Sequence, residues 1–262
     1  MRLTKHHGLG NDFLVVLASR NPGLSVDPAV AVALCDRHRG IGADGLLWGL
    51  PAERSGADLR MVLHNADGSE AEISGNGIRC LVQADARARQ IDRGETVVDT
   101  PAGRRVLAFE ATEDPLTSWV RVDMGAVSSG PEVPDVVAGA IGRHATFSIG
   151  NPHIVIEVPS VDEVDIARVG PEVERVFPGG INVHALEAVG PDAIRLVHWE
   201  RGVGVTQACG SGASVAAVAA RDWGLAGDIV TVEVPGGVAE VRIGETIELR
   251  GPATYIGEVV VP

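Results

Sequence analysis

The sequence predicts an α+β protein made of two homologous halves. Short strand-like segments outnumber segments of helical periodicity, and 33 glycines and 15 prolines supply turns between them. A block of helix, strand, Pro-x-Gly turn and strand also occurs twice at one spacing. Because few helices stand among many strands, the pattern favours α+β over an alternating parallel sheet.

The first half begins with a predicted strand, glycine turn and second strand over residues 3–18. Residues 28–38 have helical spacing, and residues 59–68 predict a strand that ends in an Asp-Gly turn. The loop ISGNGIRC, residues 73–80, then leads into a helical segment. The strands predicted after it cover residues 96–100, 101–109 and 120–125.

The second half repeats this order. Residues 146–158 predict a strand, a turn and a strand, residues 166–176 a short helix, and residues 193–202 a strand that ends in a turn. The loop ACGSGASV, residues 208–215, then opens a second helical segment. The strands predicted after it cover residues 229–234, 235–243 and 247–252.

The two loops mark an internal duplication. Ser74 and Cys209 each precede Gly-x-Gly and are 135 positions apart, while Pro101 and Pro235 are 134 apart. Matching blocks at nearly one offset indicate two homologous halves that face each other. The lobes expected are residues 1–116 plus 251–262, with the Ser74 loop, and residues 117–250, with the Cys209 loop.

The chemistry of these loops follows from their place at a helix start. A residue there lies beside unpaired backbone N–H groups, at the positive end of the helix dipole. A carboxylate bound there gains hydrogen bonds, and a cysteine there is expected to have a lowered thiol pKa. Two facing loops would place an acid/base group on each side of one carbon, which suits inversion by proton transfer. Taken singly, each loop is better explained as a glycine turn with an N-cap, and the duplication favours the site.

Composition and charge argue against several classes of function. The formal net charge of −13 disfavours a nucleic-acid partner or an anionic membrane surface. Lys5 is the only lysine, so a pyridoxal Schiff base is not expected. Three widely spaced cysteines predict no disulfide framework, and the eight histidines lack zinc-site spacing. Without a signal-peptide pattern or a long apolar run, we expect a soluble, cytoplasmic protein.

Six motifs in this chain resemble those of the diaminopimelate epimerase family. They are HHGLGNDF (6–13), GIGADGLL (40–47), NADGSEAEISGNGIRC (65–80), GNPH (150–153), GINV (180–183) and ERGVGVTQACGSGA (200–213). They follow the family's order across nearly the whole chain. The resemblance implies two pseudo-symmetric domains, each a mixed sheet around a central helix. It also implies epimerisation of LL- to meso-diaminopimelate, a step toward lysine and peptidoglycan precursors.

Members of the family use two cysteines as acid and base, and no cofactor or metal. By motif the second cysteine is Cys209, and the first falls on the residue before GNG, which here is Ser74. Cys80 does not replace it, because six residues of helix place it roughly 9 Å along the axis. Cys80 is expected to be a small buried residue. The catalytic residues implied are therefore Cys209 and Ser74.

The resemblance also implies how an amino-acid substrate is held. Glu200 would accept a hydrogen bond from an ammonium group or, with His153, tune the thiol pKa values. The backbone N–H groups expected to hold the reacting carboxylate are those of Gly75, Asn76, Gly210 and Ser211. The side chains expected at the far end of the substrate are Asn11, Asn65, Asn151, Asn182 and Arg201. The partner is thus a small molecule, and a homodimer is one expectation because family members are often dimers.

Other polar residues in the motifs are expected to be structural. Gly45 can contribute only its backbone, and Cys35 lies in an Ala/Val helix and is expected in the core. The aspartates expected to stabilise tight glycine turns are Asp12, Asp44 and Asp67. The histidines given no role are His6, His7, His64 and His198.

Ser74 leaves several explanations open, because a hydroxyl is a far weaker acid than a thiol and needs a partner base. The chain could carry an introduced Cys→Ser replacement, or belong to a serine-bearing branch that epimerises the same or another amino acid. It could also perform a one-base reaction, such as dehydration of a hydroxy amino acid with Cys209 as base. A catalytically silent ligand-binding homologue is an alternative of a different class. The retained asparagines and arginine favour diaminopimelate epimerisation.

Overall fold

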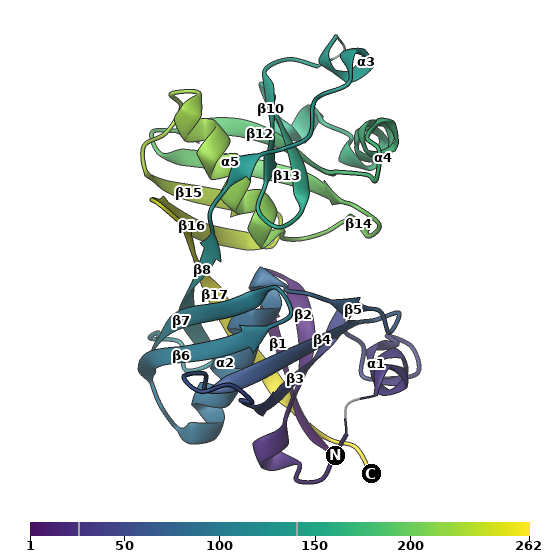
Figure 1. Ribbon diagram of the computed structural model, residues 1–262, viewed down its shortest axis with the longest axis vertical. Helices are drawn as coiled ribbons and strands as arrows, with labels where there is room; N and C mark the ends of the chain where they lie inside the picture. The colour runs from purple at the N-terminus through teal and green to yellow at the C-terminus, as the bar shows by residue number, and fades with distance from the viewer. Residues whose placement is uncertain (26, 140) are drawn as a thin grey trace. The chain divides into compact units, whose positions relative to one another are not determined.

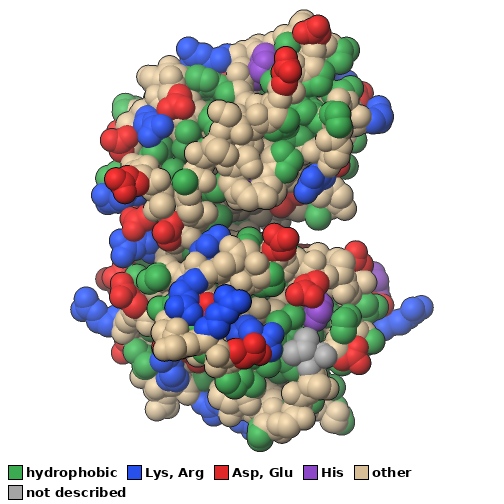
Figure 2. Space-filling model, viewed as in Figure 1, with side chains coloured by type: hydrophobic (Ala, Val, Ile, Leu, Met, Phe, Trp, Pro, Cys, Tyr) green, Lys and Arg blue, Asp and Glu red, His purple; other side chains and the backbone are tan. Residues whose placement is uncertain are grey.

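The computed structural model describes residues 1–25, 27–139 and 141–262 (Figure 1). The chain divides into two compact units. Unit 1 comprises residues 1–122 and 250–262, and unit 2 comprises residues 123–249. No helix in the described part of the chain has the length and apolar character needed to cross a bilayer. On the face drawn in Figure 2, Lys and Arg side chains lie among Asp and Glu side chains.

Unit 1 is a mixed β-sheet around one enclosed helix (Figure 1). Its elements are β1 (Arg2–Gly8), β2 (Asn11–Leu17), α1 (Pro28–Cys35), β3 (Gly45–Pro51), β4 (Leu59–Asn65), β5 (Glu70–Ala71), α2 (Gly75–Arg89), β6 (Arg93–Thr100), β7 (Gly103–Ala111) and β8 (Thr117–Gly125). A 3-10 turn (Ala18–Arg20) follows β2. The pairs β2–β3 and β4–β6 are parallel, and β1–β2, β3–β4, β4–β5, β6–β7 and β7–β8 are antiparallel.

The central helix of unit 1 is α2, which contacts β1, β2, β3, β4 and β7. Every residue from Asn76 to Ala86 is buried, so the helix is covered on all sides and not on one stripe. A second core joins α1 to β1, β2 and β3 and includes Cys35 and Trp48. The strand β17 (Ile247–Val260) returns from unit 2 and pairs antiparallel with β1. The N-terminal sheet of unit 1 is therefore closed by a segment from the far end of the sequence.

Unit 2 repeats this arrangement. Its elements are β9 (Ser128–Ser129), α3 (Asp135–Ala138), β10 (His144–Ser148), β11 (Pro152–Glu157), a 3-10 turn (Val161–Glu163), α4 (Ile166–Val176), β12 (Asn182–Gly190), β13 (Ala193–Glu200), β14 (Gly204–Val205), α5 (Gly210–Asp222), β15 (Ile229–Val234) and β16 (Gly237–Ile243). The pairs β11–β12 and β13–β15 are parallel, and β10–β11, β12–β13, β13–β14 and β15–β16 are antiparallel. The residues of α5 from Gly212 to Ala220 are buried, as in α2.

The two pairing series match strand for strand, with α1 and α4 on the parallel connections and α2 and α5 at the centres. The prediction of an α+β fold with two pseudo-symmetric halves is confirmed. Helix 166–176 was predicted with its observed ends. The helix predicted over 28–38 stops at Cys35, because the Asp36 carboxylate accepts hydrogen bonds from His38 N and Arg39 N and turns the chain.

The turn between β1 and β2 places the first asparagine of the predicted site. Gly8 pairs with Asn11, so the loop has two residues, Leu9 and Gly10, with φ of 54° and 81°. Two positive φ values define the hairpin turn that matches strand twist. Asn11 therefore begins β2 at a fixed register, at the edge of the sheet nearest the turn.

Helix α4 lies so close to β13 that one of its residues has to be glycine. A Cβ added at Gly170 would overlap the Cβ and Cγ of Trp199. We therefore expect Gly170→Ala to destabilise the protein by about 1–3 kcal/mol through overpacking. This outweighs the gain of up to about 1 kcal/mol in helix propensity. The midpoint of chemical denaturation measures the change. Gly190→Ala, with no atom within 4 Å of the added carbon, is the control and should lie close to wild type.

Candidate active site

Two helices begin at the residues predicted to be catalytic. Ser74 is the N-cap of α2 and Cys209 the N-cap of α5, with extended φ/ψ of −131°/123° and −126°/107°. The carbonyl oxygen of Ser74 accepts a hydrogen bond from Ile78 N at 2.9 Å, and that of Cys209 accepts one from Ala213 N at 2.9 Å. The serine and the cysteine thus occupy the same helical position, one in each unit.

The two side chains are engaged differently. The Oγ of Ser74 accepts a hydrogen bond from Gly77 N at 3.0 Å, the usual bond of a serine N-cap. The Sγ of Cys209 makes no cap hydrogen bond of normal geometry and lies 3.5 Å from the Oγ of Ser211. The hydroxyl of Ser74 therefore caps α2, whereas the thiol of Cys209 lies at the start of α5 without capping it.

The expectation of a lowered thiol pKa at Cys209 is wrong. Burial raises the pKa of this thiol well above its usual range, and the carboxylate of Glu200 raises it further. The hydroxyl of Ser211 and the amide of Gly212 favour the thiolate but do not offset burial. The side chain of Cys209 is only 5% exposed, so loss of hydration outweighs the field of the helix end.

Glu200 supplies the carboxylate that lies beside Cys209. It interacts with the thiol both by charge and through a side-chain hydrogen bond that favours the protonated sulfur. The hydroxyl of Thr206 donates a hydrogen bond to its Oε1. Glu200 ends β13 and Thr206 follows β14, so the short β13–β14 hairpin holds the carboxylate toward α5. The geometry supports the predicted influence of Glu200 on the thiol.

A cluster of buried histidines lies beneath the first turn of α5. A Cβ added at Gly212 would overlap the ring of His184, so glycine permits the contact. The rings of His153 and His184 stack with centroids 5.1 Å apart, and His198 lies 5.9 Å from His184. Burial lowers the pKa of His153 to about 3 and that of His198 to about 4, so these rings are neutral at physiological pH. Among the residues that the structure describes, no group of His, Cys, Asp and Glu is arranged to hold a metal.

His153 contacts Asn151 and His184. Its Nε2 lies 2.8 Å from Oδ1 of Asn151, and its Nδ1 lies 2.9 Å from Nε2 of His184. These bonds orient the amide of Asn151 at the start of β11. No hydrogen bond within the described part of unit 2 joins His153 to Cys209, so an influence on that thiol has no direct contact to carry it.

Asn182 and Arg201 form a second polar group in unit 2. The amide of Asn182 donates to Pro152 O at 2.9 Å and accepts from Arg201 N at 3.0 Å. Asn182 therefore fixes the backbone of Arg201 beside β11. The guanidinium of Arg201 donates to Gly179 O at 3.0 Å, and the residue is exposed. Both residues were predicted to bind the far end of a substrate, and the structure brings them together through the backbone.

In unit 1 the predicted asparagines form a connected chain. Nδ2 of Asn76 donates to Oδ1 of Asn11 at 3.2 Å, and Nδ2 of Asn11 donates to Asp44 at 2.7 Å. At the other end, Arg79 donates to Oδ1 of Asn76 at 2.6 Å. Sequence reasoning gave no role to Arg79, although its place four residues after Gly75 in the GNG-x-R-C motif was a signal. Asp44 has the structural role that was predicted.

Asn65 lies apart from this chain. It ends β4, pairs with Gly45 across the sheet, and its side chain donates to Ser69 Oγ at 3.0 Å. Asp67 also accepts from the hydroxyl and the N–H of Ser69, so the Asp-Gly turn stabilises itself. Asn65 is predicted to bind substrate, and the turn keeps its side chain at the strand end.

The remaining cysteines are structural, as predicted. Cys35 and Cys80 are 2% and 0% exposed and both are free thiols. Burial raises the pKa of Cys35 to about 11 and that of Cys80 to about 12. Both thiols are therefore protonated at neutral pH, and both lie in the core.

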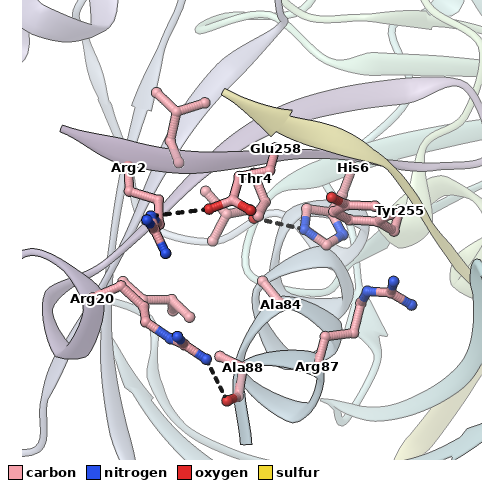
Figure 3. Close-up of a pocket in the computed structure, with 12 residues that line it drawn as sticks. Arg2, Thr4, His6, Arg20, Ala84, Arg87, Ala88, Tyr255 and Glu258 are labelled. Carbon is pink, nitrogen blue, oxygen red and sulfur yellow. Dashed lines mark hydrogen bonds and ion pairs between the residues drawn. The ribbon is translucent and has the colours of Figure 1, made fainter. Parts of the chain in front are cut away.

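A cavity of about 190 Å³ opens at the opposite end of α2 from Ser74 (Figure 3). In this view Arg2 points toward Glu258 and Arg20 toward the carbonyl of Ala88. Arg87 lies over the ring of Tyr255, 4.2 Å from its centroid. None of the predicted site residues lines this cavity, and its charged groups are paired with one another or with backbone.

The charge of Glu200 gives a direct test of the geometry around Cys209. Because Glu200 raises the pKa of the thiol, Glu200→Gln should lower that pKa and increase the thiolate fraction at pH 8. We expect alkylation of Cys209 by iodoacetamide to become about 3- to 10-fold faster, since each pKa unit changes the thiolate fraction tenfold. Peptide mass spectrometry follows each cysteine separately. Glu172→Gln, on α4, is the control, and an unchanged or slower rate in Glu200→Gln would show that the carboxylate does not act on the thiol.

Comparison with known proteins identifies the family. The family model described as diaminopimelate epimerase matches residues 3–129 and 145–259. The diaminopimelate epimerase of Microcystis aeruginosa is 37% identical over 281 residues, covering 99% of this chain and 98% of its own. That of Carboxydothermus hydrogenoformans is 38% identical over 274 residues, with 98% and 97% covered.

Solved structures share the fold at low identity. A PhzF-family phenazine biosynthesis protein from Bacillus anthracis superposes with a TM-score of 0.73 at 17% identity, covering 100% of this chain and 99% of its own. A hydroxyproline epimerase from Agrobacterium vitis, with bound trans-4-hydroxy-L-proline, gives 0.71 at 17%, with 99% and 91% covered. The sequence matches extend over both units and confirm the resemblance that the six motifs indicated. This chain belongs to the diaminopimelate epimerase family.

Proposed function

We propose that this protein epimerises LL-diaminopimelate to meso-diaminopimelate at its α-carbon without a cofactor. The observation that carries the proposal is the pair of equivalent N-caps, one of which holds a thiol beside a carboxylate. Nearly full-length relatives named diaminopimelate epimerase support the choice of substrate. In this proposal Cys209 is one acid/base residue and Ser74 occupies the position of the other.

Cys209 begins the reaction in the proposed mechanism. Its S–H proton passes to the carboxylate of Glu200, and the thiolate removes the α-proton of the substrate as H⁺. The electron pair left on carbon is delocalised into the α-carboxylate. The backbone N–H groups that would stabilise this charge are those of Gly75, Asn76, Gly210 and Ser211.

The raised thiol pKa of Cys209 suits this order of events. A thiolate formed only after proton transfer to Glu200 is a strong base, because burial leaves its charge poorly solvated. Thr206 donates to Glu200 and limits its reorientation. The carboxylate and the ammonium group of the bound substrate add charges near Cys209 and Glu200. These charges change the relative pKa values of the thiol and the carboxylate, and so the proton transfer between them.

The far end of the substrate is assigned to a set of polar side chains. These are Asn11, Asn65, Asn151, Asn182 and Arg201, of which Arg201 supplies the cation for a second carboxylate. Asn182 holds the backbone of Arg201, so its own contribution is to position that arginine. A substrate with an amino-acid group at each end fits this distribution better than a single α-amino acid.

Ser74 limits the rate at which the carbanion is reprotonated from the other face. Its hydroxyl can donate a proton, but the alkoxide left behind must be reprotonated by water, because within the described residues no base contacts this hydroxyl. The reverse reaction passes through the same transition state, so it is slowed equally. This observation favours a second candidate, a one-base reaction in which Cys209 alone exchanges the α-proton.

Deuterium exchange separates these functions. The wild-type protein is incubated with LL-diaminopimelate in D₂O, and α-deuteration and stereochemistry are followed by NMR and chiral chromatography. Deuteration with inversion supports the epimerase. Deuteration with retention shows one working base. Binding without exchange identifies a silent homologue and would sink the proposed reaction.

Restoring a thiol at position 74 tests the role of Ser74. We expect Ser74→Cys to raise the epimerisation rate by about 10²- to 10⁴-fold, the usual contribution of a positioned acid/base group. Cys80→Ser, the opposite exchange in the same helix, should leave the rate per folded molecule unchanged because Cys80 is buried in the core. A fall in activity for Ser74→Cys would show instead that the serine is the adapted residue.

A further inference from the structure

Arg79 is a fully buried cation in the first turns of α2. Its exposed fraction is 0%. The guanidinium donates to Gly75 O at 3.0 Å and to Oδ1 of Asn76 at 2.6 Å, so it lies directly behind the loop that follows Ser74. Added Cβ atoms at Gly8 and Gly251 would lie 3.3 and 3.0 Å from it, which shows that two glycines form a slot of its width.

No negatively charged group among the described residues is bonded to Arg79 in this slot. Among the described residues it has two oxygen partners, both uncharged, and its Nε has none. Burial lowers the pKa of Arg79 to about 10, so it keeps its proton at neutral pH. A buried charge without a counter-charge is unfavourable, and buried charges in proteins are usually paired.

The bonds of Arg79 also fix the direction of the asparagine chain. Arginine only donates, so Asn76 must turn its Oδ1 toward Arg79 and its Nδ2 toward Asn11. At the other end the carboxylate of Asp44 only accepts, so Asn11 must turn its Nδ2 toward Asp44. Both amides are therefore locked by groups whose hydrogen-bonding roles cannot reverse. Asn76 is one of the residues whose N–H is expected to hold the reacting carboxylate.

The equivalent position in unit 2 has the same bond without the charge. Ser214 lies four residues after Gly210, as Arg79 lies four residues after Gly75, and its hydroxyl donates to Gly210 O at 2.9 Å. A neutral hydroxyl is thus sufficient to satisfy this carbonyl. The arginine in unit 1 adds a permanent positive charge that the helix geometry does not require.

We infer that Arg79 is an electrostatic positioning residue, whose buried charge is neutralised when a substrate carboxylate binds at the start of α2. It does not touch the substrate and acts through Gly75 and Asn76. The inference rests on the proposed function for the identity of the substrate, but not for the existence of the anion site. Arg79 adds positive charge at the start of α2, so charge that develops on a carboxylate bound there is stabilised.

Three full-length variants isolate the charge. Arg79→Gln removes it and keeps a donor, Arg79→Lys keeps it, and Arg87→Gln removes a cation from the other end of the same helix. We expect Arg79→Gln to melt no lower than wild type without ligand, because an unneutralised buried charge is gone. Its Kd for LL-diaminopimelate should rise about 10- to 100-fold, the range for a lost charge-assisted interaction. Arg79→Lys and Arg87→Gln should stay within about threefold of wild type.

A second probe separates this inference from the proposed function. Inorganic sulfate is titrated against sodium chloride of equal ionic strength, and the melting temperature is recorded. Sulfate-specific stabilisation of wild type and Arg87→Gln but not of Arg79→Gln supports the inference, even if diaminopimelate fails to bind and the proposed function is wrong. Equal sulfate stabilisation of Arg79→Gln, or none in any variant, overturns it. So does an Arg79→Gln protein that is less stable without ligand or fails to fold, since its role would then be structural.

Discussion

The site depends on two helices that begin inside their sheets. The first N–H groups of any helix have no partner within the helix, and at the surface water supplies one. Here α2 and α5 are enclosed by strands almost from their first residue, so partners must come from the loop, from neighbouring side chains or from a ligand. A hydroxyl caps one helix and a thiol stands uncapped at the other. These unpaired amides are the physical basis of the anion binding that is proposed at each helix start.

The two units share the backbone geometry of the helix start but differ in the side chains around it. Both helices begin with Gly-x-Gly after an extended N-cap residue, and both enclose the carbonyl of the first glycine with a donor four residues later. The neighbours differ. Neutral buried histidines lie under α5, whereas a charged arginine and two locked asparagines lie around α2. The surroundings of the two helix starts thus differ in charge as well as in the N-cap residue.

Sequence patterns were sufficient to predict the fold because the same order of elements occurs in both halves of the chain. The loops, the Pro-x-Gly turns and the strands around them predicted two similar halves, and the short helix 166–176 was bounded by its own apolar spacing. Strands β3 and β12 were not predicted as elements, because they lie buried and lack the alternation that marks a half-exposed strand.

The candidate site was harder to predict, since burial and three-dimensional contacts decide its chemistry. The thiol pKa of Cys209 was expected to fall from its place at a helix end, but its environment is dry and contains Glu200. Arg79 and His184 lie behind the loops, and no spacing rule reports which side chain lies behind a helix turn. The motifs predicted which residues belong to the candidate site. Their protonation states could be inferred only from the structure.

The path of β17 has a consequence for how the protein is made. Unit 2 is one continuous stretch of chain, whereas unit 1 needs residues 250–262, which are synthesised after unit 2. Strand β1 therefore waits for its partner in β17 across almost the whole sequence, a contact of very long range that forms slowly. The half that is translated first is completed last. Until β17 adds Gly251, the slot that encloses Arg79 behind Ser74 lacks one of its two glycine walls.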